Sequence, residues 1–145
     1  MVQTQTPTAI PDSHRDLLDE PYHGILTTMM PDGQPQCTLV WCDTDGEAAR
    51  VNTTRERQKG RNLMAYPRAT LLIVDPADSS RWIEIRGRVE LIEEGAVEHL
   101  DALTRQYTRH PCYYGFVYSE EQRDRETRII CWIIPHRINC DAIHK

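Results

Sequence analysis

The sequence lacks the features that mark several large classes of protein. It has no apolar run of 18 residues, and its first eleven residues carry no positive charge and no apolar segment. We therefore expect neither a membrane span nor a signal peptide. With a net charge of -5, the chain also lacks the broad basic face that nucleic-acid backbones require. A cytoplasmic protein that binds neither membrane nor nucleic acid is expected.

The cysteines and histidines are too scattered to indicate a metal or disulfide framework. The five cysteines form an odd set without a Cys-x-x-Cys pair, and we interpret them as small buried side chains in a reducing compartment. The six histidines show no metal-binding spacing, so no metal is assigned. No Ser-His-Asp or Cys-His constellation is recognisable, so no catalytic residue is identified.

The length of 145 residues fits one domain. Residues 1–11 are rich in Thr, Gln and Pro and are expected to form a flexible tail, followed by a single domain over residues 12–145. The apolar fraction of 39% is lean for a core of this size. A core shared between two subunits would relieve that shortage.

The order of elements favours a mainly β domain. Short helices are expected at about 13–20, capped by Ser13, and at 57–66, and an amphipathic helix at about 95–109. Strand-like runs lie at 23–30, 36–43, 48–54, 69–75, 81–91 and 128–134, the last resuming through 140 if there is a seventh strand. Short turns at Pro31-Asp32-Gly33 and Thr44-Asp45-Gly46 join consecutive strands. The pattern predicts a six- or seven-stranded antiparallel barrel with peripheral helices.

Two of the strands have distinct patterns. The run 69–75 is almost wholly apolar, which is typical of a strand buried on both faces. The run 81–91 alternates, with an apolar face opposite a face that carries Glu84, Arg86, Arg88 and Glu90. We interpret this charged face as a set of cross-strand ion pairs at a surface or a dimer interface.

Residues 53–62 form the most informative segment, with the sequence Thr-Thr-Arg-Glu-Arg-Gln-Lys-Gly-Arg-Asn. Four cations and one acid lie between a strand-like run and a helix-like run. Cations are disfavoured at a helix N-terminus unless an anion is bound there, and helix N–H groups attract phosphate. The segment therefore predicts a site for a phosphate-bearing small molecule.

This segment resembles a known family when it is taken together with two others, Gly24 to Gln36 and Arg81 to Val89. Their order and spacing are similar to the pyridoxamine 5′-phosphate oxidase-like split-barrel flavin and deazaflavin proteins, most of all to the small oxidoreductases that use coenzyme F420. The resemblance covers about residues 12–140 and implies a split β-barrel. It also implies a homodimer with the cofactor in a groove between subunits.

The resemblance assigns roles to six residues. Thr53 and Thr54 match hydroxyl positions at the end of the third strand, and Arg57 and Lys59 match phosphate-binding positions of the following loop. Gln36 and Thr38 match positions along the edge of the cofactor ring. Arg55 and Arg61 are weaker candidates, and Asn62 serves either helix packing or ligand contact.

The resemblance implies an oxidoreductase that uses reduced F420 for hydride transfer to a small conjugated acceptor. The first alternative is an FMN-binding flavoprotein or flavin reductase related to pyridoxamine 5′-phosphate oxidase, and the second is a non-enzymatic flavin or tetrapyrrole carrier. Trp82 stands where the vitamin B6 oxidases carry Gln, which argues against oxidation of pyridoxamine phosphate. The aromatic loop Pro111 to Tyr118 either lines the substrate side or packs in the dimer, and Trp41 is assigned to core or dimer packing.

Overall fold

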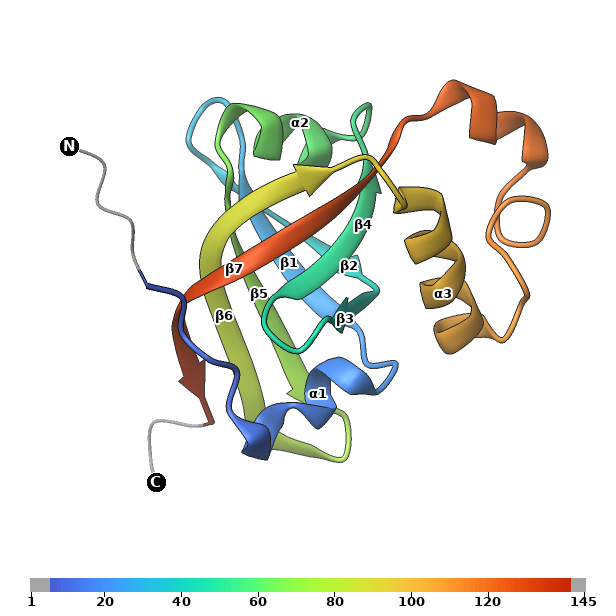
Figure 1. Cartoon of the computed structure of the whole chain (residues 1–145). Helices are drawn as coiled ribbons and strands as arrows, with labels where there is room; N and C mark the ends of the chain where they lie inside the picture. Colours follow the sequence, from blue (N-terminus) through green and yellow to red (C-terminus); the bar gives the residue numbers. More distant parts are fainter. Residues whose placement is uncertain (1–5, 142–145) are drawn as a thin grey trace.

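Seven antiparallel strands form one sheet in the order β2-β1-β5-β6-β7-β4-β3, and the sheet curls into a split barrel (Figure 1). The computed structural model describes residues 6–141. The strands are β1 (Gly24–Met29), β2 (Pro35–Val40), β3 (Cys42–Thr44), β4 (Ala49–Thr54), β5 (Arg68–Asp75), β6 (Asp78–Ile92) and β7 (Arg128–Cys140). The helices are α1 (Asp16–Asp19), α2 (Gln58–Ala65) and α3 (Ala96–Thr108), with 3-10 turns η1 (Asp12–His14) and η2 (Glu120–Arg125). The predicted fold class is confirmed.

The two predicted turns connect the strands as their residues dictate. Gly33 and Gly46 adopt positive φ angles of 85° and 104°, which residues with a side chain rarely adopt. Asp32 Oδ1 accepts the Gln34 N–H at 3.0 Å, and Thr44 Oγ1 accepts the Gly46 N–H at 2.9 Å. Local hydrogen bonds of this kind fix the hairpins at the ends of β1 and β3.

The core fills the inside of the barrel and follows the two-residue period of the strands. In β5 the inward side chains Ala69, Leu71 and Ile73 are buried, whereas the outward side chains Thr70, Leu72 and Val74 are only half-buried. The prediction that β5 is buried on both faces is therefore wrong for the single chain. Its outward apolar residues account for the uninterrupted apolar run in the sequence.

Strand β7 contains a bulge at its proline. Gly87 of β6 pairs with Pro135, but Arg86 pairs with Arg137, so His136 has no partner across the strands. Proline has no N–H to donate, and in sheets it is found at edges and bulges. The strand continues beyond the bulge to Cys140, as the seven-strand interpretation expected.

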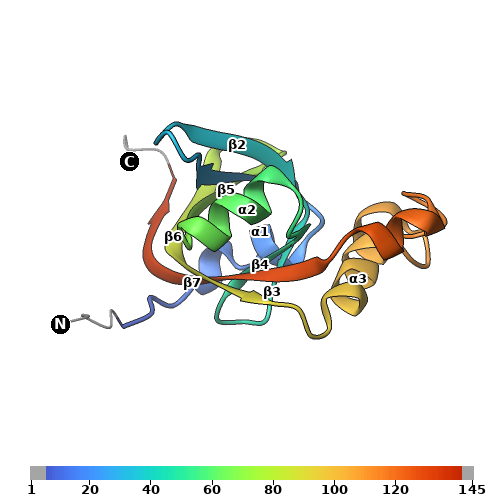
Figure 2. The ribbon, with the colours of Figure 1, turned by 90° about the horizontal axis from the view of Figure 1, so that it is seen from above.

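Helix α2 lies across one end of the barrel (Figure 2). It begins directly after β4, and Gly60 in its first turn packs against the last residue of that strand. A Cβ atom at position 60 would lie 1.9 Å from the carbonyl oxygen of Thr54. Only glycine permits this approach, which holds the start of the helix against the strand.

Helix α3 lies beside the barrel, next to β4 and β7 (Figures 1 and 2). Its Tyr107 hydroxyl donates to the carbonyl oxygen of Tyr22 at 2.6 Å and accepts the N–H of Cys42 at 3.0 Å. Leu100 and Leu103 are buried, as their helical spacing predicts. No described helix is both long and apolar enough to cross a bilayer.

Some local expectations are wrong. Ser13 caps no helix, because its hydroxyl contacts His14 Nδ1 instead, at 2.8 Å. The expected tail over residues 1–11 overlaps packed residues: Thr8 donates its N–H to the Pro135 carbonyl oxygen at 2.8 Å, and Ile10 is buried. Residues 1–5 of that tail lie outside the described residues. Among the five cysteines, Cys37 is exposed rather than buried.

We predict that Gly60→Ala destabilises the protein although alanine is the better helix former by about 1 kcal/mol. The new methyl group meets the Thr54 carbonyl, so α2 must move, and we expect the free energy of unfolding to fall by about 1–3 kcal/mol. Urea unfolding followed by circular dichroism measures this. The control Met64→Ala, at an exposed site of the same helix, should change stability by less than about 0.5 kcal/mol. Unchanged stability of Gly60→Ala would contradict the packing described.

Candidate functional site

The start of α2 is an uncapped helix N-terminus. No side chain caps it, and the residue before the helix, Arg57, is extended. Thr54 Oγ1 accepts the Arg57 N–H at 3.0 Å, which fixes the turn between β4 and α2. An uncapped helix start presents free N–H groups and the positive end of the helix dipole, and both favour a bound anion.

The four cations of the segment separate into two pairs. Arg57 and Lys59 line a common pocket on one side of α2. Arg55 turns toward Glu93, at 3.5 Å, and Arg61 donates to Gln58 Oε1 and to the backbone oxygen of Glu56. Only the first pair therefore belongs to the pocket.

The single acid of the segment is turned away from this pocket. Both carboxylate oxygens of Glu56 accept the N–H of Thr127, at 3.1 and 3.0 Å, and this hydrogen bond lowers the pKa of Glu56. The Arg55 N–H in turn donates to the Thr127 carbonyl oxygen at 3.0 Å. Glu56 thus fastens the loop between β4 and α2 to the start of β7, and its charge does not neutralise the cations of the pocket.

The pocket encloses about 310 Å³ between β2, β4, α3 and the aromatic loop. A third cation, Arg128 at the start of β7, lines it together with Arg57 and Lys59. The remaining wall is mainly apolar and aromatic: His23, Leu39, Val40, Trp41, Asn52, Leu100, Leu103, Tyr113 and Val117. Three cations in a mostly apolar pocket suit a ligand with one anionic group and a flat apolar body.

The side chain of Arg128 is only 4% exposed, and several contacts hold it in place. It donates to Glu126 at 2.9 Å and to the Tyr114 hydroxyl at 2.9 Å, and its guanidinium carbon lies 4.7 Å from the centre of the Tyr113 ring. A cation over an aromatic face is stabilised by the ring quadrupole. Arg57 reaches the other oxygen of Glu126 at 3.8 Å, so this carboxylate lies between the two arginines.

Lys59 has no hydrogen bond or ion pair to any of the described side chains. Partial burial, together with the nearby charge of Arg57, lowers the pKa of Lys59. An ammonium group under these conditions gains more from a bound anion than a solvated one does. Lys59 is therefore the cation of the pocket that is most available to a ligand.

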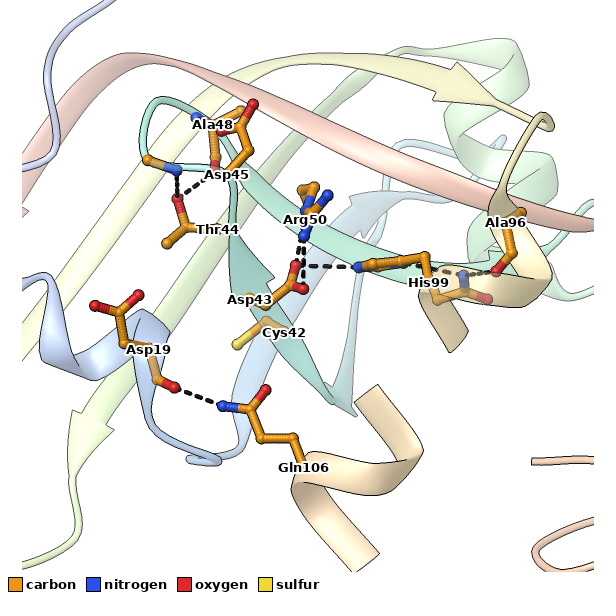
Figure 3. A network of polar contacts seen from close by, with 12 residues as sticks. Asp19, Cys42, Asp43, Thr44, Asp45, Ala48, Arg50, Ala96, His99 and Gln106 are labelled. Atoms are coloured by element: carbon orange, nitrogen blue, oxygen red, sulfur yellow. Dashed lines mark hydrogen bonds and ion pairs between the residues drawn. The ribbon is translucent and has the colours of Figure 1, made fainter. Parts of the chain in front are cut away.

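A polar network connects the pocket to α3 (Figure 3). The Asn52 amide nitrogen donates to the Ala96 carbonyl at 2.8 Å and lies 3.1 Å from His99 Nδ1. That ring nitrogen must then accept, so the proton is on Nε2, which donates to Asp43 at 3.0 Å. Arg50 completes the network with two hydrogen bonds to Asp43, at 2.9 and 2.8 Å.

This network fixes Asn52, and through it Arg128. Asn52 Oδ1 faces the Arg128 guanidinium at 3.4 Å. Burial alone would raise the pKa of Asp43, but the hydrogen bonds from His99 and Arg50 outweigh it and the pKa is lowered. The Asp43 carboxylate therefore stays ionised and holds α3 against β3 and β4.

The other predicted site residues lie outside this pocket, Thr53 and Thr54 buried at the end of β4 and Gln36 and Thr38 half-buried on the edge strand β2. Thr53 is fully buried, and its hydroxyl, like that of Thr38, has no hydrogen-bond partner within residues 6–141. Gln36 accepts from the Asn62 amide at 3.3 Å beneath α2. None of these three, nor Thr54, lines the pocket of Arg57 and Lys59. Two buried hydroxyls without a partner are consistent with a site whose hydrogen bonds are completed by a ligand.

Aromatic side chains shape the outer wall of the pocket. Trp41 stacks on Tyr107 with ring centres 5.4 Å apart and meets Tyr113 edge to face. Within the loop Pro111 to Tyr118, Tyr113 and Tyr114 are buried, whereas Phe116 and Tyr118 are exposed. Trp41 packs between the barrel and α3, and the loop contributes to the pocket through Tyr113 and Val117.

Sequence analysis missed Arg128, Glu126 and Asn52. Arg128 is 69 or more positions away from the segment 53–59 in the sequence, and only the pairing of Thr54 with Arg128 brings them together. The isolated arginine at the start of an otherwise apolar strand was the available signal. The place of this arginine in the pocket can be recognised only when the pairing of β4 with β7 is known.

Comparison with known proteins agrees with the fold. A solved F420 reductase is 31% identical, with a TM-score of 0.75 over 90% of this chain and 98% of that one. The conserved hypothetical protein Rv2991 from Mycobacterium tuberculosis is 24% identical, with a TM-score of 0.69 over 97% of this chain and 89% of that one. A putative pyridoxamine 5′-phosphate oxidase from Listeria innocua is 20% identical, with a TM-score of 0.67 over 89% and 95%. No curated protein matches.

The family model described as pyridoxamine 5′-phosphate oxidase matches residues 10–139, nearly the whole of the described chain. Together with the split barrel and the 31% identity to a solved relative, this match decides the family. The chain belongs to the pyridoxamine 5′-phosphate oxidase family of split-barrel proteins.

Proposed function

We propose that the protein is an oxidoreductase that binds reduced coenzyme F420 and uses it for hydride transfer to a small conjugated acceptor. The observation that carries this proposal is the cluster of Arg57, Lys59 and Arg128 at an uncapped helix start. The similarity to an F420 reductase over 90% of the chain supports the choice of cofactor.

The residues of the pocket fit such a cofactor. Lys59 and Arg57 would hold the phosphate, with Arg128 behind them. Thr53 and Thr54 are buried at the end of β4 and do not line the pocket; Thr54 would contribute by positioning Arg57, whose N–H its hydroxyl accepts. Gln36 and Thr38 would lie along the ring edge. When bound, the deazaflavin ring supplies the hydride, so the protein needs no nucleophile of its own. The aromatic wall of Trp41 and Tyr113 keeps water from the acceptor.

FMN is the alternative cofactor, because the same cations suit its phosphate and the family includes flavin-binding members. A carrier of flavin or tetrapyrrole without turnover is the second alternative. Five cysteines without a disulfide among the described residues fit a cytoplasmic, reducing location, which we propose for this protein.

We also propose that the protein works as a homodimer that completes the cofactor groove. Ile25 of β1 lies directly between Leu39 of β2 and Leu72 of β5 on the outer face of the barrel. Leu39 is 70% exposed although it is a large apolar side chain. A row of outward apolar residues that crosses neighbouring strands up to the edge of the sheet is typical of a subunit interface.

The first test is a titration of the cofactor-free protein with F420 and with FMN, followed by tryptophan fluorescence. We expect tight binding of F420 and weak binding of FMN. The reverse order would assign the protein to the FMN-dependent branch, and binding of neither would overturn the proposal. Turnover of the reduced cofactor with conjugated acceptors then separates an enzyme from a carrier.

Substitutions in the pocket test where the phosphate binds. Lys59→Ala and Arg57→Ala should each weaken cofactor binding by about 1.5–3 kcal/mol, the range for hydrogen bonds to charged groups. The matched controls Arg55→Ala and Arg61→Ala remove cations of the same segment that point elsewhere, and they should leave affinity unchanged. Equal losses in all four variants would indicate a general effect of charge rather than a site.

The lowered pKa of Lys59 predicts how affinity depends on pH. The ammonium group must be charged to bind phosphate, so affinity should fall as the pH rises. Because the pKa lies below the ordinary value of 10.5, the fall should begin at a lower pH than for a solvated lysine. Titrations between pH 7 and pH 10 measure this, and Lys59→Arg, which stays charged, should flatten the profile. The same profile in both proteins would show that Lys59 does not contact the anion.

The dimer is tested by light scattering coupled to size-exclusion chromatography. We expect a dimer whose interface buries more than about 2,000 Å² and which Leu39→Glu converts to a monomer with weaker cofactor binding. A charged residue there would be desolvated in the interface, whereas it costs nothing on an exposed surface. A monomer for the unmodified protein would contradict the proposal.

A further inference from the structure

A separate hollow of the described chain encloses about 800 Å³ and shares no residue with the pocket of Lys59. It lies between α2, the β1–β2 hairpin, the start of β5 and the middle of β6. Its apolar wall is made by Met29, Met30, Pro31, Ala65 and Ala69. Arg61, Arg68 and Arg86 also line it.

A second hollow of about 450 Å³ continues from the first. The two share Arg68, Arg86 and Gly87, and the second adds His136 and Arg137. Four arginines therefore lie along one connected cavity on the surface of a protein whose net charge is -5.

The strand register places these arginines opposite one another. Arg86 of β6 pairs with Arg137 of β7, and Arg68 of β5 pairs with Arg88 of β6. Like charges directly across a sheet are destabilising. The predicted cross-strand ion pairs are therefore wrong, because the charged side chains of β6 pair along their own strand instead.

The acids nearby offset only part of this charge. Glu84 pairs with Arg86 at 3.0 Å and Glu90 with Arg88 at 2.8 Å, each two residues away on β6. Arg68 and Arg137 have no acidic partner among residues 6–141. Two uncompensated guanidinium groups thus lie along the same cavity.

A residue with a buried unpaired polar atom lines the second hollow as well. This residue is His136, the bulged residue of β7, whose Nδ1 is buried without a hydrogen-bond partner among the described residues. Buried polar atoms are nearly always paired in native proteins. The bulge at Pro135 therefore leaves both an unpaired ring nitrogen and an unpaired arginine next to the cavity.

We infer that this cavity is a second ligand site for an amphiphilic anion, a molecule with a compact apolar body and a carboxylate. The methionine, proline and alanine wall takes the apolar body, and Arg68 and Arg86 bind the carboxylate through charge-assisted hydrogen bonds. The volume of the first hollow, about 800 Å³, lies in the range of sites for small molecules, about 300–1,000 Å³. A purely polar anion would leave the apolar wall unused, and a neutral apolar molecule would leave the arginines uncompensated.

The inference is tested on the cofactor-free protein with 8-anilinonaphthalene-1-sulfonate as a fluorescent probe and decanoate as competitor. Decanoate should displace the probe, whereas decanol, with the same chain and no charge, should compete about tenfold more weakly or worse. Equal competition by the two would overturn the proposal, as would failure of both to displace the probe.

Variants then locate the site. The double variant Arg68→Gln/Arg86→Gln should weaken decanoate binding by about tenfold or more, since it removes two charged donors. The matched control Arg88→Gln removes an arginine of the same sheet face that does not line the cavity, and it should change binding by less than about twofold. Lys59→Ala should likewise have no effect, which separates this site from the cofactor pocket. Equal losses in Arg88→Gln and the double variant would overturn the assignment.

The unmodified protein gives an independent measurement. Raising NaCl from 50 to 500 mM should weaken decanoate binding but not decanol binding, because salt screens only the charged contact. An unchanged affinity for decanoate at high salt would overturn the inference even if the double variant failed to fold.

Discussion

The contact between Gly60 and the carbonyl oxygen of Thr54 determines the geometry of both hollows. Because the first turn of α2 has no side chain at this point, the helix begins directly on the end of β4 and crosses the mouth of the barrel. Lys59 then lies on one side of the helix, and Arg61 lies on the other. A helix held a few ångströms further out would bring neither cation to its cavity.

In this acidic protein, cations gather around the two hollows, whereas several acids are already bound to hydrogen-bond donors or cations elsewhere. Glu56 is committed to the N–H of Thr127, Asp43 to His99 and Arg50, and Glu84 and Glu90 to arginines of their own strand. Glu126 alone lies among the cations of the Lys59 pocket. It keeps Arg57 and Arg128 in position, and Lys59 is left as the cation without a resident partner.

Much of the fold followed from the sequence because its signals are local. Alternating side chains predicted β6, and turn residues predicted the hairpins. The segment 53–62 predicted an anion site because cations at a helix start conflict with the helix dipole. Binding of the cofactor at this site is a proposal. The choice of F420 over FMN is also a proposal, because the fold and the family model fit both cofactors.

The features that could not be predicted from the sequence depend on contacts between residues far apart in the chain. Arg128 enters the pocket through its pairing with Thr54, and the direction of each cation in the segment 53–62 depends on whether an acid such as Glu93 lies within reach. The pairing of the β6 charges depended on which residues stand across the strands, and that register cannot be derived from alternation alone. Ile25, Leu39 and Leu72 likewise meet on one face only through the register of β1.

The bulge at His136 changes which side of β7 faces the core. Up to Pro135 the odd-numbered residues of β7 point inward, as buried Ile129, Cys131 and Ile133 show. Beyond the extra residue the even-numbered Ile138 and Cys140 pack against the core instead. One inserted residue thus reverses the parity of the strand. Without it Arg137 would point into the barrel, so a single irregularity keeps a guanidinium out of the core and adds it to the outer surface.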